Sequence, residues 1–228
     1  MKTPLLIVLL TAACLWLSSC GKPEPEPLLP QEVTDFHALY SENCAACHGI
    51  NGKTQSAVQP LNDPLWLALA PKDVIRHTIE YGRPGTLMAA FGEKGGGQLT
   101  EKQVDSLVNG IEAWAKPEAV QGIALPPYAS TTAGDANQGQ HVYQTVCAVC
   151  HGEKGVGGVI NDPSFLGLIS DQAIRTTILA GWPGHGMPDW RSLRPGHPLT
   201  DQEITDVVAY LSSQRSPLQT KAQNMVGQ

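Results

Sequence analysis

The sequence has few cysteines and no long apolar run. Four of the six cysteines lie in two Cys-x-x-Cys pairs, and the other two, Cys14 and Cys20, lie close to the N-terminus, which leaves no pair for a structural disulfide. The longest apolar stretch runs from Leu5 to Leu17 and is interrupted only by Thr11. A helix that crosses a bilayer needs about 20 apolar residues, so this stretch is too short to be favoured as a membrane span.

Basic residues are also scarce. The chain has 15 lysines and arginines against 21 aspartates and glutamates, which gives a formal net charge of −6. Proteins that bind nucleic acids are usually basic, because their lysines and arginines neutralise phosphates. We therefore expect no nucleic-acid partner, and an acidic surface is instead attracted to basic patches on protein partners.

The N-terminus resembles the signal peptide of a bacterial lipoprotein, because Lys2 and the apolar run are followed by Leu17-Ser18-Ser19-Cys20. The resemblance implies that residues 1–19 are removed and that Cys20 becomes the lipidated first residue of the mature protein. The chain would then be anchored to a membrane on the periplasmic side, outside the cytoplasm. An uncleaved membrane anchor is the alternative.

Residues 20–31 alternate prolines with charged side chains. This composition favours extended polyproline II backbone, which rises about 3 Å per residue. We interpret the segment as a semi-rigid tether with a reach of roughly 30 Å. A spacer without any function is the alternative.

Two pentapeptides carry the strongest signal in the chain, Cys44-Ala45-Ala46-Cys47-His48 and Cys147-Ala148-Val149-Cys150-His151. The pattern Cys-x-x-Cys-His is typical of covalent haem c attachment. On a helix the two cysteines and the histidine share one face, so two thioether bonds and one iron ligand reach the same porphyrin. We predict two covalently bound haem c groups, attached through Cys44 and Cys47 and through Cys147 and Cys150, with His48 and His151 as iron ligands.

Two other kinds of site also use Cys-x-x-Cys, namely a thioredoxin-like dithiol and one half of a zinc site. Neither explains why a histidine follows both pairs at the same offset. Haem attachment is therefore the favoured interpretation.

The chain also contains an internal repeat. Asn62-Asp63-Pro64 recurs as Asn161-Asp162-Pro163, and from there the two segments align without a gap at an offset of 99 residues as far as Met88 and Met187. The two haem motifs lie 103 residues apart, so the first copy has a longer loop before its Asn-Asp-Pro turn. One module is used twice.

Each module ends in a predicted helix, with Thr100 and Thr200 as N-caps followed by acidic residues. The apolar residues that follow have helical spacing in both copies: Val104, Leu107, Val108 and Ile111 in the first, and Ile204, Val207, Val208 and Leu211 in the second. Strand-like alternation is scarce throughout. We predict an all-α fold.

These patterns divide the chain into a first domain at residues 32–116, a linker rich in proline, glycine, serine and threonine at 117–134, a second domain at 135–215 and a flexible tail at 216–228. A domain of about 80 residues is small for an apolar core. A buried haem would supply part of that core.

The order of the motifs resembles a tandem of class I c-type cytochrome domains, a resemblance that covers nearly all residues from 32 to 215. In that family small helices wrap around one haem, and methionine is the sixth ligand of the iron. The resemblance implies that Met88 and Met187 are these ligands. Only Met187 is followed by the proline that is usual in the family, and His77 and His185 are the alternative ligands.

A second departure concerns the contact between the first and last helix of each domain. The second domain has the family's glycine, Gly139, on the first helix and an aromatic residue, Tyr210, on the last. The first domain has Phe36 and Gly110 at these positions, so we expect the large and the small partner to be exchanged with the contact volume kept. Two unrelated substitutions are the alternative.

Arg76 and Arg175 occupy equivalent positions of the repeat. We expect both to be exposed on an amphipathic helix, and pairing with a haem carboxylate is the alternative.

With both axial positions of each iron filled, small molecules could not bind, so electron transfer is favoured over catalysis. We predict a membrane-anchored di-haem c-type cytochrome that transfers single electrons between redox proteins or membrane complexes of a respiratory or photosynthetic chain, and that is not an enzyme. Two alternatives stay open: a di-haem peroxidase-like oxidoreductase, which needs an open sixth position, and a haem subunit of a larger oxidase or dehydrogenase complex.

Overall fold

The computed structural model describes residues 29–54, 58–83, 86–152 and 160–216 of the chain. The chain divides into two compact units, residues 1–33 and residues 34–228. In the first unit the structure describes one short 3₁₀ helix, η1 (Pro30–Glu32). The predicted signal peptide, Cys20, most of the tether and nearly all of the tail lie outside the described residues.

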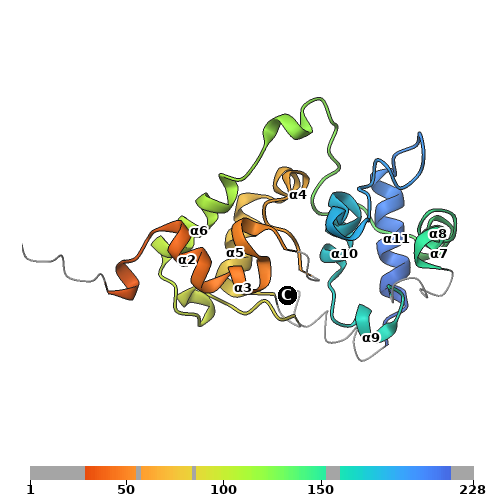
Figure 1. Cartoon of the computed structure of the whole chain (residues 1–228). Helices are drawn as coiled ribbons and strands as arrows, with labels where there is room; N and C mark the ends of the chain where they lie inside the picture. The colour runs from red at the N-terminus through yellow and green to blue at the C-terminus, as the bar shows by residue number, and fades with distance from the viewer. Residues whose placement is uncertain (1–28, 55–57, 84–85, 153–159, 217–228) are drawn as a thin grey trace, which may run out of the picture. The chain divides into compact units, whose positions relative to one another are not determined.

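The second unit is built from helices (Figure 1). The first series is α2 (Phe36–Asn43), α3 (Ala45–His48), η2 (Ile50–Gly52), α4 (Pro64–Leu69), α5 (Lys72–Tyr81), η3 (Glu93–Gly95) and α6 (Glu101–Glu112). After η4 (Pro117–Val120), the second series is α7 (Ala136–Val142), the π-helical turn η5 (Tyr143–Cys147), α8 (Ala148–His151), α9 (Pro163–Leu166), α10 (Asp171–Ala180), η6 (Pro183–His185) and α11 (Asp201–Ser213).

The α-helices of the two series follow the same order, and the all-α prediction is confirmed. Extended pairing in the described part of the chain is limited to two isolated bridges, Gly92 with Leu99 and Trp182 with Met187. No helix in the described ranges is both long and apolar enough to cross a membrane.

The repeated Asn-Asp-Pro turn is a helix start in both copies. Asp63 caps α4 by accepting a hydrogen bond from the backbone N–H of Trp66 at 2.7 Å. Asp162 caps α9 by accepting from the backbone N–H of Ser164 at 2.8 Å. The proline that follows each aspartate occupies the first helical turn, where its missing N–H costs nothing.

The last helix of each series begins with a capping box, as its threonine predicts. Thr100 accepts from the N–H of Gln103 at 3.4 Å, and Gln103 accepts from the N–H of Thr100 at 3.0 Å. Thr200 and Glu203 form the same reciprocal pair at 3.2 and 2.8 Å. These caps fix where α6 and α11 begin, and therefore which faces they bury.

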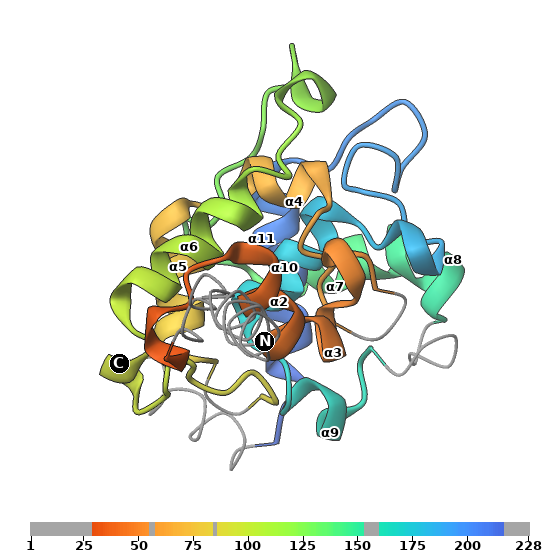
Figure 2. The ribbon, with the colours of Figure 1, turned by 60° about the vertical axis from the view of Figure 1, so that its left-hand side comes forward.

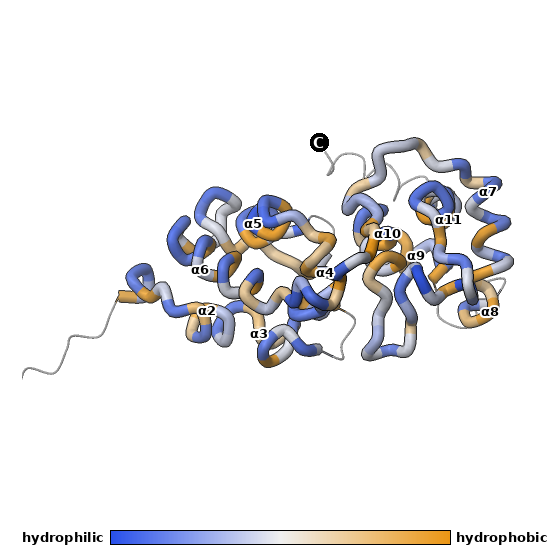
Figure 3. Tube along the Cα trace, turned by 90° about the horizontal axis from the view of Figure 1, so that it is seen from above, coloured by the Kyte–Doolittle hydropathy of each residue, from blue (hydrophilic) through white to orange (hydrophobic). Residues whose placement is uncertain are grey.

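The buried faces are those that the helical spacing predicts. Val104, Leu107 and Val108 of α6 have no exposed surface. In α11, Ile204 is fully buried and Val207 is 1% exposed. Hydrophobic segments of α5 and α10 add to the two apolar clusters (Figure 3).

Close packing of the first helix against the last is confirmed in both series. Helix α2 packs on α6, and α7 packs on α11 (Figures 1 and 2). A Cβ added at Gly139 would lie 2.9 Å from the Cβ of Tyr210 and would overlap the carbonyl oxygen of Asp206. A Cβ added at Gly110 would instead overlap the ring of Phe36. The large and small partners are therefore exchanged between the helices, as expected.

The expectation for Arg175 was wrong, because this arginine is neither exposed nor directed to a haem carboxylate. Its side chain is 3% exposed and pairs with Asp201. It also donates to the carbonyl oxygens of Pro127 and Tyr128 at 2.8 and 3.0 Å. Arg76, its counterpart, pairs with Asp105 at the surface. Only in the second copy does this position hold the linker.

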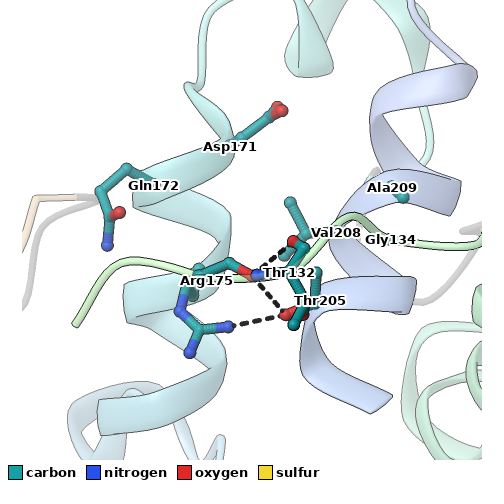
Figure 4. Close-up of a pocket in the computed structure, with 9 residues that line it drawn as sticks. Thr132, Gly134, Asp171, Gln172, Arg175, Thr205, Val208 and Ala209 are labelled. Carbon is teal, nitrogen blue, oxygen red and sulfur yellow. Dashed lines mark hydrogen bonds between the residues drawn. The ribbon is translucent and has the colours of Figure 1, made fainter. Parts of the chain in front are cut away.

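The same arginine lies at the edge of a cleft of about 220 Å³ between α10, α11 and the end of the linker. Figure 4 shows Arg175 pointing from α10 toward Thr205 of α11, to which it donates at 3.2 Å. All three guanidinium nitrogens have protein acceptors. Arg175 therefore has a structural role at this cleft, and its positive charge is neutralised by Asp201.

The glycine and aromatic contact gives a stability prediction. Gly110→Ala should lower the free energy of unfolding of the haem-loaded protein by about 1–3 kcal/mol, because the new methyl group overlaps the Phe36 ring. Urea denaturation measures the change. In a Phe36→Ala background the same substitution should cost much less, and an equal cost in both backgrounds would contradict the contact.

Candidate haem-binding sites

The first Cys-x-x-Cys-His motif spans the junction of α2 and α3. Cys44 joins the two helices, and Cys47 and His48 lie on the single turn of α3. The Nδ1 atom of His48 lies 3.0 Å from the carbonyl oxygen of Gln59. Because a carbonyl only accepts, Nδ1 carries the proton and Nε2 keeps its lone pair for a metal ion. The sequence predicts the three side chains on one face of a helix; the structure breaks that helix at Cys44, and only Cys47 and His48 lie on α3.

The second motif has the same arrangement at the end of η5 and in α8. Cys147 ends the π-helical turn, and Cys150 and His151 lie on α8. A π-helical turn is rare and is often found at functional sites. Here it directly precedes the attachment turn, a detail that helical periodicity in the sequence does not predict.

A tyrosine ties each motif to the helix before it. Tyr40 donates its hydroxyl hydrogen to the carbonyl oxygen of Gly49 at 3.0 Å, and Tyr143 donates to Gly152 at the same distance. Both glycines follow the motif histidine and have positive φ, 74° and 72°. A side chain at Gly49 would overlap the backbone of Lys53. The bond and the glycine together hold the turn that carries the histidine.

The ionisation of the motif side chains favours haem attachment over a redox dithiol. Burial, and then the charge of the second cysteine, raise the pKa of Cys44 and of Cys147 to about 11. A reactive dithiol needs the opposite, a lowered pKa that populates the thiolate. The thioredoxin-like alternative therefore loses support.

The histidines are held in the neutral form that binds metals. Burial lowers the pKa of His48, the bond to Gln59 opposes this, and the charge of Arg83 lowers the pKa further. Burial alone lowers the pKa of His151. A neutral imidazole is the form that coordinates iron.

Met88 and Met187 lie on matching backbone hairpins. The N–H of Arg83 donates to the carbonyl oxygen of Met88 at 2.8 Å, and the N–H of Trp182 donates to that of Met187 at 2.8 Å. The glycine before each donor has a φ near 70° and leaves no room for a Cβ beside the methionine carbonyl. Both methionine side chains are half-buried. Their ligand role stays a prediction.

An unpartnered indole N–H in the second domain fits a haem. Among the described residues three buried side-chain nitrogens have no hydrogen-bond partner: Nδ1 of His151, Nε1 of Trp182 and Nε of Arg194. With Nε2 of His151 as the iron ligand, its Nδ1 points away from the porphyrin, so the donor that bears on the haem is Nε1 of Trp182. A buried N–H without an acceptor is costly, so a group that carries acceptors fits beside it. Haem c has two carboxylate side chains. The sequence alone does not reveal this donor, because a tryptophan in a haem pocket or in a core does not show where its N–H points.

The tyrosine bond gives a pH prediction. Burial, and to a smaller extent the charge of Cys44, raise the pKa of Tyr40 to about 12. In the unfolded chain a tyrosine has a pKa of about 10. The folded protein therefore holds this proton more tightly, and the free energy of unfolding should fall as the pH rises from about 10 to about 12.

Tyr40→Phe should remove this part of the pH dependence and should cost about 1 kcal/mol at neutral pH through the lost hydrogen bond. Denaturant midpoints measured across the alkaline range test both effects. A variant with the slope of the parent protein would show that Tyr40 ionisation is not linked to unfolding.

The model of one protein family, described as cytochrome c oxidase, cbb3-type, subunit III, matches the chain twice, over residues 31–109 and 134–211. The cbb3-type cytochrome c oxidase subunit CcoP of an Azospirillum species is 32% identical over 142 residues, which are 58% of this chain and 43% of that protein. Subunit FixP of Bradyrhizobium diazoefficiens is 28% identical over 186 residues, 78% of this chain and 61% of that protein.

A cytochrome c6 of a Synechococcus species is 31% identical over 111 residues, which are 47% of this chain and 88% of that protein. The chain thus spans about half the length of the cbb3-type relatives named above and is about twice as long as the part it shares with the small cytochrome.

The family match falls once on each repeat, and each matched segment contains one attachment motif and one methionine hairpin. The cofactors are accordingly two covalently bound c-type haems. The chain belongs to the family of the cbb3-type cytochrome c oxidase subunit III, as a tandem of two c-type cytochrome domains.

Proposed function

We propose that the protein is a one-electron carrier that uses its two haems in series. The observation that carries the proposal is the duplicated site: each domain presents an attachment turn locked by a tyrosine and a methionine on the same hairpin. Haem c, when bound, supplies an iron centre that takes up and releases one electron. The chain's own residues supply the covalent attachment, the axial ligands and the apolar surroundings.

We further propose that His48 and Met88 ligate the first iron and that His151 and Met187 ligate the second. The neutral histidines and the backbone bond that the pairs Arg83–Met88 and Trp182–Met187 share support this assignment. Methionine opposite histidine raises the reduction potential of a haem. With both positions occupied by the protein, substrates are kept from the metal, which favours a carrier over a peroxidase-like enzyme.

The partner class follows from the relatives. Two of them are named as subunits of cbb3-type cytochrome c oxidases. We propose that this chain exchanges electrons with a membrane electron-transfer complex of that kind, as a subunit or a docked carrier. We propose that Cys20 holds it at the membrane as a lipidated residue on the periplasmic side.

Removing a methionine ligand should open one iron. Met187→Ala should leave both haems attached, lower the reduction potential of one haem and allow carbon monoxide to bind to that haem in its ferrous form. Met88→Ala should do the same at the other haem. The matched control is Met225→Ala, which removes a methionine that no domain is predicted to use.

Visible spectra with and without carbon monoxide, together with the haem content of each variant, measure these changes. If the parent protein binds carbon monoxide at one haem and Met88→Ala changes nothing, the ligand assignment in the first domain is wrong. The peroxidase-like alternative would then lead.

Lipid anchoring predicts a strict dependence on Cys20. Cys20→Ser should abolish incorporation of labelled fatty acid and should release the protein from the membrane fraction with both haems attached, whereas Cys14→Ser should change neither. A Cys20→Ser protein that stays in the membrane fraction would favour the uncleaved anchor.

The proposed partner predicts a second result. Purification of the parent protein from detergent-solubilised membranes should bring a redox complex with it.

A further inference from the structure

The two domains differ in charge at one structurally equivalent position beside the predicted iron ligands. Arg83 and Trp182 each stand five residues before the methionine of their domain, directly after the positive-φ glycine that ends the preceding helix. Each donates its backbone N–H to the methionine carbonyl oxygen at 2.8 Å. The two domains share this backbone bond and its position, whereas the return bond differs: Met187 donates its N–H to the carbonyl oxygen of Trp182 at 3.2 Å, and Met88 donates to the hydroxyl of Thr86 at 3.1 Å.

In the second domain this side chain carries a buried donor without an acceptor in the described part of the chain. Nε1 of Trp182 is buried and has no acceptor among the described residues. A carboxylate of a haem bound in the same domain would satisfy such a donor. The side chain at this position would then lie beside the negatively charged groups of the cofactor.

In the first domain the same position carries a permanent positive charge, because arginine is protonated at every relevant pH. The guanidinium group of Arg83 makes no hydrogen bond or ion pair with another described residue. The backbone N–H of Arg83 is bonded to the carbonyl oxygen of Met88 at 2.8 Å. The charged residue therefore adjoins the hairpin that carries the predicted methionine ligand of the first iron.

At the equivalent position of the second domain, Trp182 carries no charge. Two charged residues do follow Met187, namely Asp189 and Arg191. They pair with each other at 2.7 Å and so add little net charge. The position of Arg83 and Trp182 is thus one at which the two repeats differ by a full charge beside a predicted methionine ligand.

We infer that this position sets the difference in reduction potential between the two haems, with Arg83 making the first iron a better electron acceptor than the same site would be with tryptophan. The inference rests on the proposed haem ligation. A nearby cation disfavours the ferric state, which carries one more positive charge than the ferrous state. Position 83 therefore favours residence of the electron in the first domain, and Trp182 holds its carboxylate without this effect.

Reciprocal substitutions in the haem-loaded full-length protein test the inference. Arg83→Trp should lower the potential of one haem, and Trp182→Arg should raise the potential of the other. The expected size is about tenfold in the equilibrium between oxidation states, which corresponds to about 59 mV for a one-electron couple. Potentiometric titration followed by visible spectroscopy reads out both steps.

Two further variants serve as controls. Arg83→Lys keeps the charge and should keep the potential close to that of the parent protein. Arg76→Gln removes a cation of the same domain that pairs with Asp105 at the surface, and it should leave both potentials in place. If Arg83→Trp proves unstable, Arg83→Gln removes the charge without adding bulk.

The outcomes separate this inference from the proposed function. Attached haems whose potentials do not respond to Arg83→Trp and Trp182→Arg would overturn the inference and leave the carrier proposal standing. A shift as large in Arg76→Gln as in Arg83→Gln would also overturn it, because the effect would then be one of net charge. A parent protein whose irons prove not to be ligated by these histidines and methionines would instead overturn the proposed function.

Discussion

The close crossing of the first and last helix in each domain is the constraint on which the rest of the structure depends. Only where one helix lacks a side chain can the other bring an aromatic ring to its backbone. The crossing fixes the helix that leads into the attachment turn, and the tyrosine on that helix then holds the turn through its bond to Gly49 or Gly152. Together these contacts position the histidine of each attachment motif.

The crossing constrains the combined volume of two side chains, as the exchange of Phe36 and Gly110 relative to Gly139 and Tyr210 shows. The total volume at the crossing is kept while the identity of the large partner changes sides. Neither helix needs a particular residue, because the packing requires one small and one large side chain in contact. The sequence alignment of the two repeats was sufficient to predict this contact, since both members of each pair lie in well-defined helices.

Local signals predicted most of the fold. Threonine before an acidic residue marks a helix start through hydrogen bonds within three residues, so Thr100 and Thr200 could be placed from sequence alone. The Asn-Asp-Pro segments were recognised only as a repeated turn, although Asp63 and Asp162 cap helices in the same local way. Arg175 could not be placed from sequence, because its partners at Pro127 and Tyr128 lie more than 40 residues away along the chain. Its equivalence to Arg76 was misleading, since only the second domain has a linker to hold.

The candidate sites also contain one part that the sequence predicts and one that it does not. The Cys-x-x-Cys-His motifs could be recognised in the sequence because haem attachment demands fixed residue types at fixed spacing. The donor at Trp182 could not be recognised, because a tryptophan that fills a core and one that presents its N–H to a cofactor look the same in a sequence. Burial without a partner distinguishes the two.

The central claim is that both irons are held between histidine and methionine for electron transfer. A spectroscopic redox titration of the unmodified haem-loaded protein, with and without carbon monoxide, tests it most directly. The account predicts two high-potential one-electron steps that carbon monoxide leaves unchanged. A low-potential haem, or a step that shifts when carbon monoxide is added, would show an open iron and contradict the account.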